Sequence, residues 1–164
     1  MLKEVLRKIQ EISKEPVEFK KEEDTYIFYI DNRKYVVEFI KRINEINAYE
    51  ILFYVNKNDD MLFVLMNDNN KPLVVKNTIL KIIEDFTKNN IVEVLGFKGD
   101  ISEPSRVRKY KRYIIDLSKI LNFKIISQFP LKNYYRFLLF KNKEVYDFFK
   151  NNKEEVIKEF EIKS

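Results

Sequence analysis

Hydrophobic residues recur along this chain with two different periods, which predicts a mixture of strands and helices. Runs rich in aromatic and β-branched residues cover residues 25–30, 34–40, 49–55 and 61–65, and we expect a strand in each. The polar turn at residues 31–33 separates the first two runs and indicates a hairpin. The first part of the chain is therefore predicted to be an antiparallel meander of four strands.

Residues 91–126 organise the second part of the chain. An apolar run over 91–97, interrupted only by Glu93, predicts a strand covered on both faces. Ser102 is a suitable helix cap and Pro104 suits a first helical turn, so we expect a helix over 103–121. Its buried face is predicted from apolar residues that recur at steps of three and four, namely Val107, Tyr110, Ile114, Leu117 and Leu121.

Further helices and strands flank this segment. Amphipathic periodicity predicts an N-terminal helix over 2–14 and a C-terminal helix over 142–160. A third helix follows Pro72, with Asn77 or Thr78 as its cap and a buried face of Ile79, Ile82, Ile83 and Phe86. Strands are expected over 123–129 and 134–140, on either side of a turn at Pro130. The predicted fold class is α+β, with a mixed, mostly antiparallel sheet, flanking helices and a single domain over 1–164 that has its sheet and helices in 25–140.

The composition excludes several kinds of chemistry. The chain has no cysteine and no histidine, which rules out disulfides, thiolate or imidazole zinc sites, and nucleophile pairs that depend on histidine. Asp59, Asp60 and Asp68 are acidic loop residues, but no glycine-containing calcium loop surrounds them. We therefore expect no metal site and no cofactor.

Positive charge is concentrated on the helix predicted over 103–121. The 31 basic residues of the chain outnumber its 26 acidic residues by five. Five basic residues crowd the first turns of this helix, where Glu103 is the only acid nearby: Arg106, Arg108, Lys109, Lys111 and Arg112. Either these residues form the solvated face of a covering helix, or they contact nucleic-acid phosphates with a salt slope of about −4 to −5. In the second case Tyr113, on one face with Arg106 and Lys109, would supply base stacking.

The N-terminal segment is charged throughout, which is typical of neither a signal peptide nor a membrane span. We expect a cytoplasmic protein with no membrane partner, or, for a phage-encoded chain, one located in the virion or the host cytoplasm. The exposed edges of a meander and the aromatic-rich tail favour a protein partner or self-association.

The predicted order of four strands, helix, strand, helix and two strands resembles that of GNAT-type N-acetyltransferases over residues 25–140. In those enzymes the helix after the fifth strand often carries Asn, then Ala three residues later and Tyr seven residues later, with Gly-Phe four residues beyond the Tyr. With residues 122–123 in place of Gly-Phe, these positions hold Lys111, Ile114 and Ser118, none of which matches. Residues 105–110, SRVRKY, are also similar to a segment of short uncharacterised bacterial and phage proteins.

The resemblance implies an acetyl-CoA site in which a glycine-rich loop presents backbone N–H groups to the pyrophosphate. The corresponding residues 69–77 contain no glycine. Ser118 stands where the usual tyrosine acid would be, and Tyr110 is the nearest phenol on the same helix. Tyr110 would serve as the acid if acetyl transfer survived, and otherwise it is a core aromatic residue.

Three functions stay open. The leading expectation is a non-catalytic binding or structural protein on a degenerate GNAT-like scaffold, since the cofactor loop lacks glycine and no carboxylate pair has a recognisable spacing. The alternatives are a nucleic-acid-binding protein that uses the basic helix 103–121, and an N-acetyltransferase.

Overall fold

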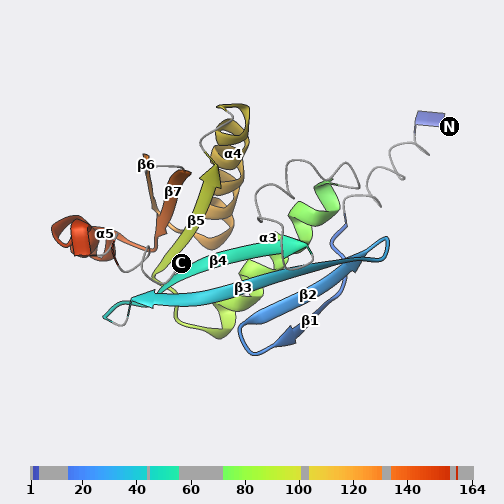
Figure 1. Ribbon diagram of the computed structural model, residues 1–164, viewed down its shortest axis with the longest axis horizontal. Coiled ribbons are helices and arrows are strands. Elements are labelled where there is room, and N and C mark those ends of the chain that lie inside the picture. The colour runs from blue at the N-terminus through green and yellow to red at the C-terminus, as the bar shows by residue number, and fades with distance from the viewer. Residues whose placement is uncertain are drawn as a thin grey trace. The chain divides into compact units, whose positions relative to one another are not determined.

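The computed structural model describes residues 2–3, 15–43, 45–55, 72–100, 104–130, 134–155 and 158, and Figure 1 shows its helices and strands. Among these residues the strands are β1 Phe19–Glu22, β2 Thr25–Ile30, β3 Arg33–Ile43, β4 Ala48–Val55, β5 Val94–Asp100, β6 Ile125–Pro130 and β7 Tyr134–Phe140. The helices with defined bounds are α3 Pro72–Asn89, α4 Pro104–Leu121 and α5 Lys143–Asn151.

The seven strands form one sheet in the order β1-β2-β3-β4-β5-β7-β6. The pairs β1/β2, β2/β3, β5/β7 and β6/β7 are antiparallel, whereas β4 and β5 are parallel. The predicted α+β class with a mixed, mostly antiparallel sheet is thus confirmed. The predicted hairpin is also present: Asp31 and Asn32 link β2 to β3 with φ angles of 48° and 68°, as a two-residue turn of this kind requires.

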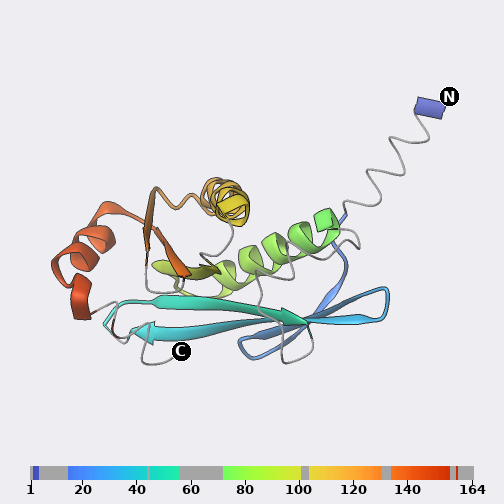
Figure 2. The same ribbon diagram turned by 45° about the horizontal axis from the view of Figure 1, so that its top comes forward.

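The chain divides into two compact units, of which unit 1 comprises Met1–Glu38 and Phe53–Phe86. Its core contains three stacked aromatic rings, Phe28, Tyr35 and Phe53, with centroids 4.9 to 6.3 Å apart. Within this unit α3 lies along the strands (Figure 2). Tyr26 Oη of β2 donates a hydrogen bond to Asp85 Oδ2 of α3 at 2.9 Å, and the backbone N–H of Val17, which precedes β1, donates to Thr78 Oγ1 of α3 at 3.0 Å.

Unit 2 comprises Phe39–Leu52 and Thr87–Ser164. In both views of the ribbon α4 and α5 lie on opposite sides of the β7/β6 pair (Figures 1 and 2). Side chains of successive strand residues point to opposite faces, so each face of these strands has its own cover. One face forms a cluster with α5 through Ile43, Ala48, Val94, Leu138, Phe140, Val145 and Phe149. On the other side α4 buries Ile114 and Leu117, two residues of its predicted apolar stripe.

Several predicted element boundaries need correction. The helix expected from Asn77 or Thr78 begins at Pro72, because proline suits the first turn of a helix. Thr78 is instead an interior residue whose hydroxyl donates to Val74 O at 2.7 Å. The sheet starts at β1 rather than at residue 25, and β1 was missed because its sequence, FKKE, has little apolar content.

The strand predicted over 91–97 is displaced by three residues, because β5 runs from Val94 to Asp100. The remaining predicted elements agree with the structure more closely or lie outside the described residues. Strand 134–140 coincides with β7, and helix 103–121 coincides with α4 to within one residue. The four residues predicted for the buried face of α3 are all buried, and Val74, Val75 and Thr78 of the same helix are buried with them. The C-terminal helix, expected over 142–160, has α5 bounds of Lys143–Asn151. The strand predicted over 61–65 and the cap at Ser102 lie outside the described residues, as does the N-terminal helix apart from Leu2 and Lys3, which are helical.

Candidate functional site

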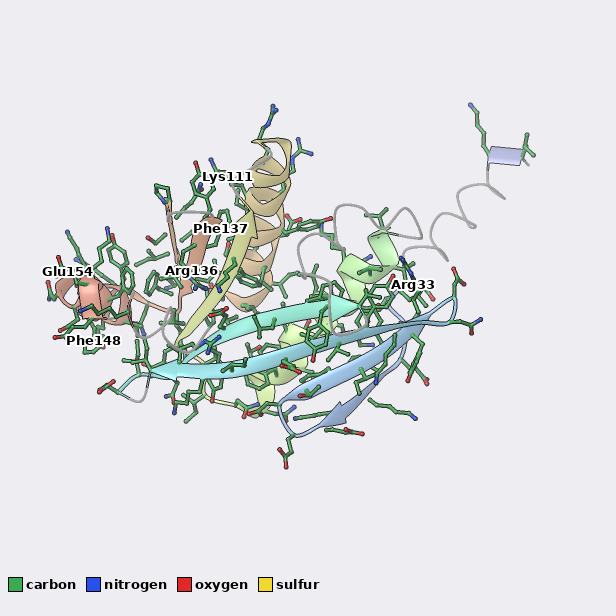
Figure 3. All side chains as sticks on the ribbon, in the orientation of Figure 1. Arg33, Lys111, Arg136, Phe137, Phe148 and Glu154 are labelled. Carbon is green, nitrogen blue, oxygen red and sulfur yellow. The ribbon has the colours of Figure 1, made fainter. Side chains whose placement is uncertain are left out.

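Three charged side chains meet in the interior of unit 2, one each from β3, β4 and β7. Arg42 Nε donates a hydrogen bond to Glu50 Oε2 at 3.1 Å, and Arg136 Nη1 forms an ion pair with the same oxygen at 3.3 Å. Exposure of the three residues is 2%, 0% and 1%, in that order. Arg42 and Arg136 each have a further interaction, whereas Glu50 Oε1 has no hydrogen-bond partner in the described part of the chain. We call these residues the charged triad (Arg136 is labelled in Figure 3).

The strand register explains how the triad forms across an intervening strand. Glu50 on β4 pairs with Gly96 on β5, and Gly96 pairs with Leu138 on β7. Arg136 precedes Leu138 by two residues and therefore points to the same face of the sheet. Its side chain must cross β5 to reach Glu50, two strand spacings or roughly 10 Å away. Gly96, one of only two glycines in the chain, places no side chain in that path.

The charged triad also marks the end of the ladder between β4 and β5. Parallel pairing of these strands runs from Ala48 with Val94 to Glu50 with Gly96, a total of three described residue pairs. Since the three side chains are almost completely removed from solvent, no substrate reaches them in this structure. The triad therefore connects β3, β4 and β7 within unit 2, and the arrangement is that of a structural cross-link.

An exposed stripe on α4 is the second charged feature of unit 2. Helical steps of 100° place six residues of α4 within a face about 100° wide, and the structure describes the side chains of five of them. All five are exposed, and we call them the α4 stripe: Arg108, Lys111, Arg112, Ile115 and Lys119. The only acidic residue in the α4 sequence, Asp116, is half-buried and falls outside this face. Four cations therefore lie together on α4 with no acid among them.

The α4 stripe contains part of the nucleic-acid site predicted from the sequence. Arg108, Lys111 and Arg112 are exposed as expected (Lys111 is labelled in Figure 3). Arg106 and Lys109 belong to α4, but their side chains lie outside the described residues, and the same holds for Tyr110. Tyr113 is half-buried and lies about 100° round the helix from Arg112, away from the stripe.

Sequence reasoning overlooked Lys119 and the charged triad, although each left a signal. Lys119 follows Arg112 by seven residues, two helical turns, so a helical projection of the whole segment would have found it. Glu50 and Arg136 are charged residues within largely apolar strands, and Ala48 and Leu138, two positions away from them, are apolar. Residues two positions apart in a strand share a face, so the sequence places each charge on a buried face. Pairing them with each other and with Arg42 requires the strand register.

Unit 1 contains two tyrosines that donate hydrogen bonds to carboxylates. Burial, followed by the hydrogen bond to Asp85, raises the pKa of Tyr26 above its ordinary value. Burial also raises the pKa of Tyr54 to about 12, and the hydrogen bond that Tyr54 Oη donates to Glu38 Oε1 acts in the same direction. Both phenols are therefore held in the protonated, hydrogen-bond-donating form around neutral pH.

The described residues contain no group of three or more acidic side chains that could hold a metal ion. Asp59, Asp60 and Asp68 lie outside that part of the chain. No helix in the described ranges is long and apolar enough to cross a membrane.

Comparisons of this chain with protein-family models, curated protein sequences and solved structures give no match. The functional argument therefore depends on the residues of this chain alone.

Proposed function

We propose that this chain is a nucleic-acid-binding protein and that the α4 stripe is its phosphate-contacting surface. The observation that carries the proposal is the acid-free row of four exposed cations on one face of one helix, namely Arg108, Lys111, Arg112 and Lys119. Lysine and arginine side chains that neutralise phosphates release condensed counterions, and this release drives sequence-independent binding. A helix that packs on a sheet through Ile114 and Leu117 holds these cations in fixed relative positions.

The proposal includes a GNAT-like scaffold that serves binding rather than acyl transfer. Within residues 25–140, the range of the resemblance, the described elements follow the order β2, β3, β4, α3, β5, α4, β6 and β7, and the strand expected over 61–65 lies outside the described residues. The parallel pairing of β4 with β5, beside four described pairings that are antiparallel, is consistent with the resemblance. Glu50, at the end of that pairing, is part of the charged triad, and residues 69–77 contain no glycine for a pyrophosphate cradle. Both features favour a binding function.

The proposed function predicts strongly salt-sensitive binding. Four phosphate contacts give a slope of about −3.6 for log K against log salt on duplex DNA, so a roughly fourfold rise in salt weakens binding about 100-fold. Fluorescence anisotropy with a labelled duplex at several salt concentrations measures both quantities. An absence of salt-sensitive binding at micromolar protein would overturn the proposal.

A matched pair of double variants tests whether the α4 stripe is responsible. Lys111→Glu/Lys119→Glu reverses two charges on the stripe, whereas Lys143→Glu/Lys150→Glu makes the same change at exposed positions of α5 in the same unit. Losing two contacts should reduce the salt slope by about 2 and weaken binding to every sequence alike. The α5 variant should keep the wild-type slope. Equal losses in both variants would assign the binding to overall charge and contradict the proposal.

N-acetyl transfer is the second candidate. The pairing of β4 with β5 ends after three residue pairs, at Gly96. Beyond Gly96, the described pairings of β5 are with β7 alone. Acetyl-CoA bound at one hundred times its dissociation constant would stabilise the fold by about 2.7 kcal/mol. A thermal-shift measurement with millimolar acetyl-CoA therefore decides this candidate. An unchanged melting temperature removes it, and with it the role of Tyr110 as an acid.

A further inference from the structure

We infer that the α4 stripe binds B-form double-stranded DNA, with α4 placed along the major groove. The inference rests on the proposed function and names the ligand class of that site. It depends on three properties of the stripe: how its cations are distributed across it, the position of its one apolar member, and the type of side chain that it lacks.

Two cations of the α4 stripe lie on opposite sides of an apolar residue. Lys111 and Arg112 are consecutive residues, so they point about 100° apart, and Ile115 falls between them at about 40° from one and 60° from the other. Ile115 is 44% exposed although it is a large aliphatic residue. Arg108 and Lys119 extend the row to a length of about 16 Å along the helix axis. Lys111 and Arg112 thus lie at the two edges of the stripe, whereas Arg108 and Lys119 lie along its middle, two turns before and one turn after Ile115.

This distribution matches the major groove of B-form DNA. The groove is about 12 Å wide and admits an α-helix, and phosphates line both of its edges. With α4 in the groove, Lys111 and Arg112 face opposite phosphate backbones, while Ile115 points toward the floor. Aliphatic side chains make favourable contacts there with thymine methyl groups. The other side of α4 remains packed on its own strands through Ile114 and Leu117.

The alternatives within nucleic acids fit the stripe less well. Proteins that bind single strands stack bases on aromatic side chains, and none of the five members of the α4 stripe is aromatic. A-form RNA duplexes have a deep, narrow major groove that side chains cannot read. Duplex DNA is therefore the ligand class that uses both the flanking cations and the central isoleucine.

Binding to three labelled probes of one length and sequence tests the ligand class. The probes are a DNA duplex, one of its single strands and the corresponding RNA duplex, measured by anisotropy at one salt concentration. We expect the full-length protein to bind the DNA duplex about tenfold or more tightly than either of the others. Equal or tighter binding to the single strand or to the RNA would overturn the inference but leave the proposed function intact. Failure to bind any probe would overturn both.

Two single variants test the position of Ile115. Ile115→Glu places a carboxylate between the cations. Ile120→Glu makes the same change about 140° round the helix from Ile115, at a side chain with a similar exposed fraction, 47% for Ile120 and 44% for Ile115. We expect Ile115→Glu to weaken DNA-duplex binding at least about tenfold and Ile120→Glu to stay within about threefold of the wild type. Circular dichroism confirms that both variants fold, and Ile115→Gln, which adds no charge, replaces any variant that does not. Equal weakening at both positions would overturn the groove geometry.

Discussion

The guanidinium Nη1 of Arg136 lies 3.3 Å from the carboxylate Oε2 of Glu50, although β5 separates the strands to which the two residues belong. Arg42 contacts the same oxygen from a third strand. A buried carboxylate that pairs with two buried cations is costly to remove, since both positive charges would then lie in a low-dielectric interior without it. This relationship makes the stability of unit 2 depend on a small number of residues.

Gly96→Ala should destabilise the protein by about 1–3 kcal/mol, because a methyl group on β5 would obstruct the path of Arg136 to Glu50. Gly99→Ala is the matched control. It lies three positions along the same strand and therefore faces the opposite side of the sheet. Urea unfolding of both variants measures the two changes in free energy of unfolding. Equal changes would show that the loss comes from strand backbone effects rather than from the charged triad.

Glu50→Gln should cost about 3–5 kcal/mol in the free energy of unfolding, since it leaves two buried guanidiniums without their shared carboxylate. Arg136→Met should cost less, at most about 2 kcal/mol, because the Arg42–Glu50 pair survives and methionine retains much of the apolar volume. Chemical denaturation of the two variants gives the comparison. A larger loss for Arg136→Met would contradict the central position of Glu50.

Alkaline pH should destabilise unit 1 through Tyr54. Its pKa is about 12 in the folded protein and about 10 in the unfolded chain, so the folded state retains the phenol proton more strongly. The resulting stabilisation is fully present below about pH 10 and is lost as pH rises from there to about 12. Tyr54→Phe has no such proton to lose, and its denaturation midpoint should fall less steeply over this range. Tyr26, whose pKa is also raised, is present in both proteins, and the difference between them therefore isolates Tyr54. Parallel pH profiles would contradict the prediction.

Thr78→Val should destabilise unit 1 by about 1–2 kcal/mol. The Thr78 hydroxyl is completely buried, donates to Val74 O and accepts from the backbone N–H of Val17. Valine has the same shape but cannot accept that hydrogen bond, so a partly buried N–H loses its partner. Thr78→Ser keeps the hydroxyl and loses one methyl group. Thermal unfolding should show that Thr78→Ser retains the contribution of the hydrogen bond and that Thr78→Val loses it. If Thr78→Ser were less stable than Thr78→Val, packing would dominate at this position.

Local sequence patterns were enough to locate most helices and strands, because the pattern of a helix or strand depends on residues close together in the chain. The aromatic run of β7 and the apolar spacing of α4 gave boundaries correct to within one residue. β1 has no such pattern, and the structure shows why it is a strand all the same: Phe19 to Glu22 pair with Phe28 to Thr25 of β2. Its strand conformation comes from its neighbour rather than from its own composition.

The sequence by itself determined the α+β class, the absence of histidine and cysteine chemistry, and a basic helix after β5. It also placed Arg108, Lys111 and Arg112 on that helix, since helical periodicity depends only on residues a few positions apart. Tertiary structure alone decided that Arg42, Glu50 and Arg136 meet from three different strands, and that Gly96 on the intervening β5 leaves the path from Arg136 to Glu50 open. The physical reason is that strand register and strand order join residues far apart in the chain, and no local period encodes those distances.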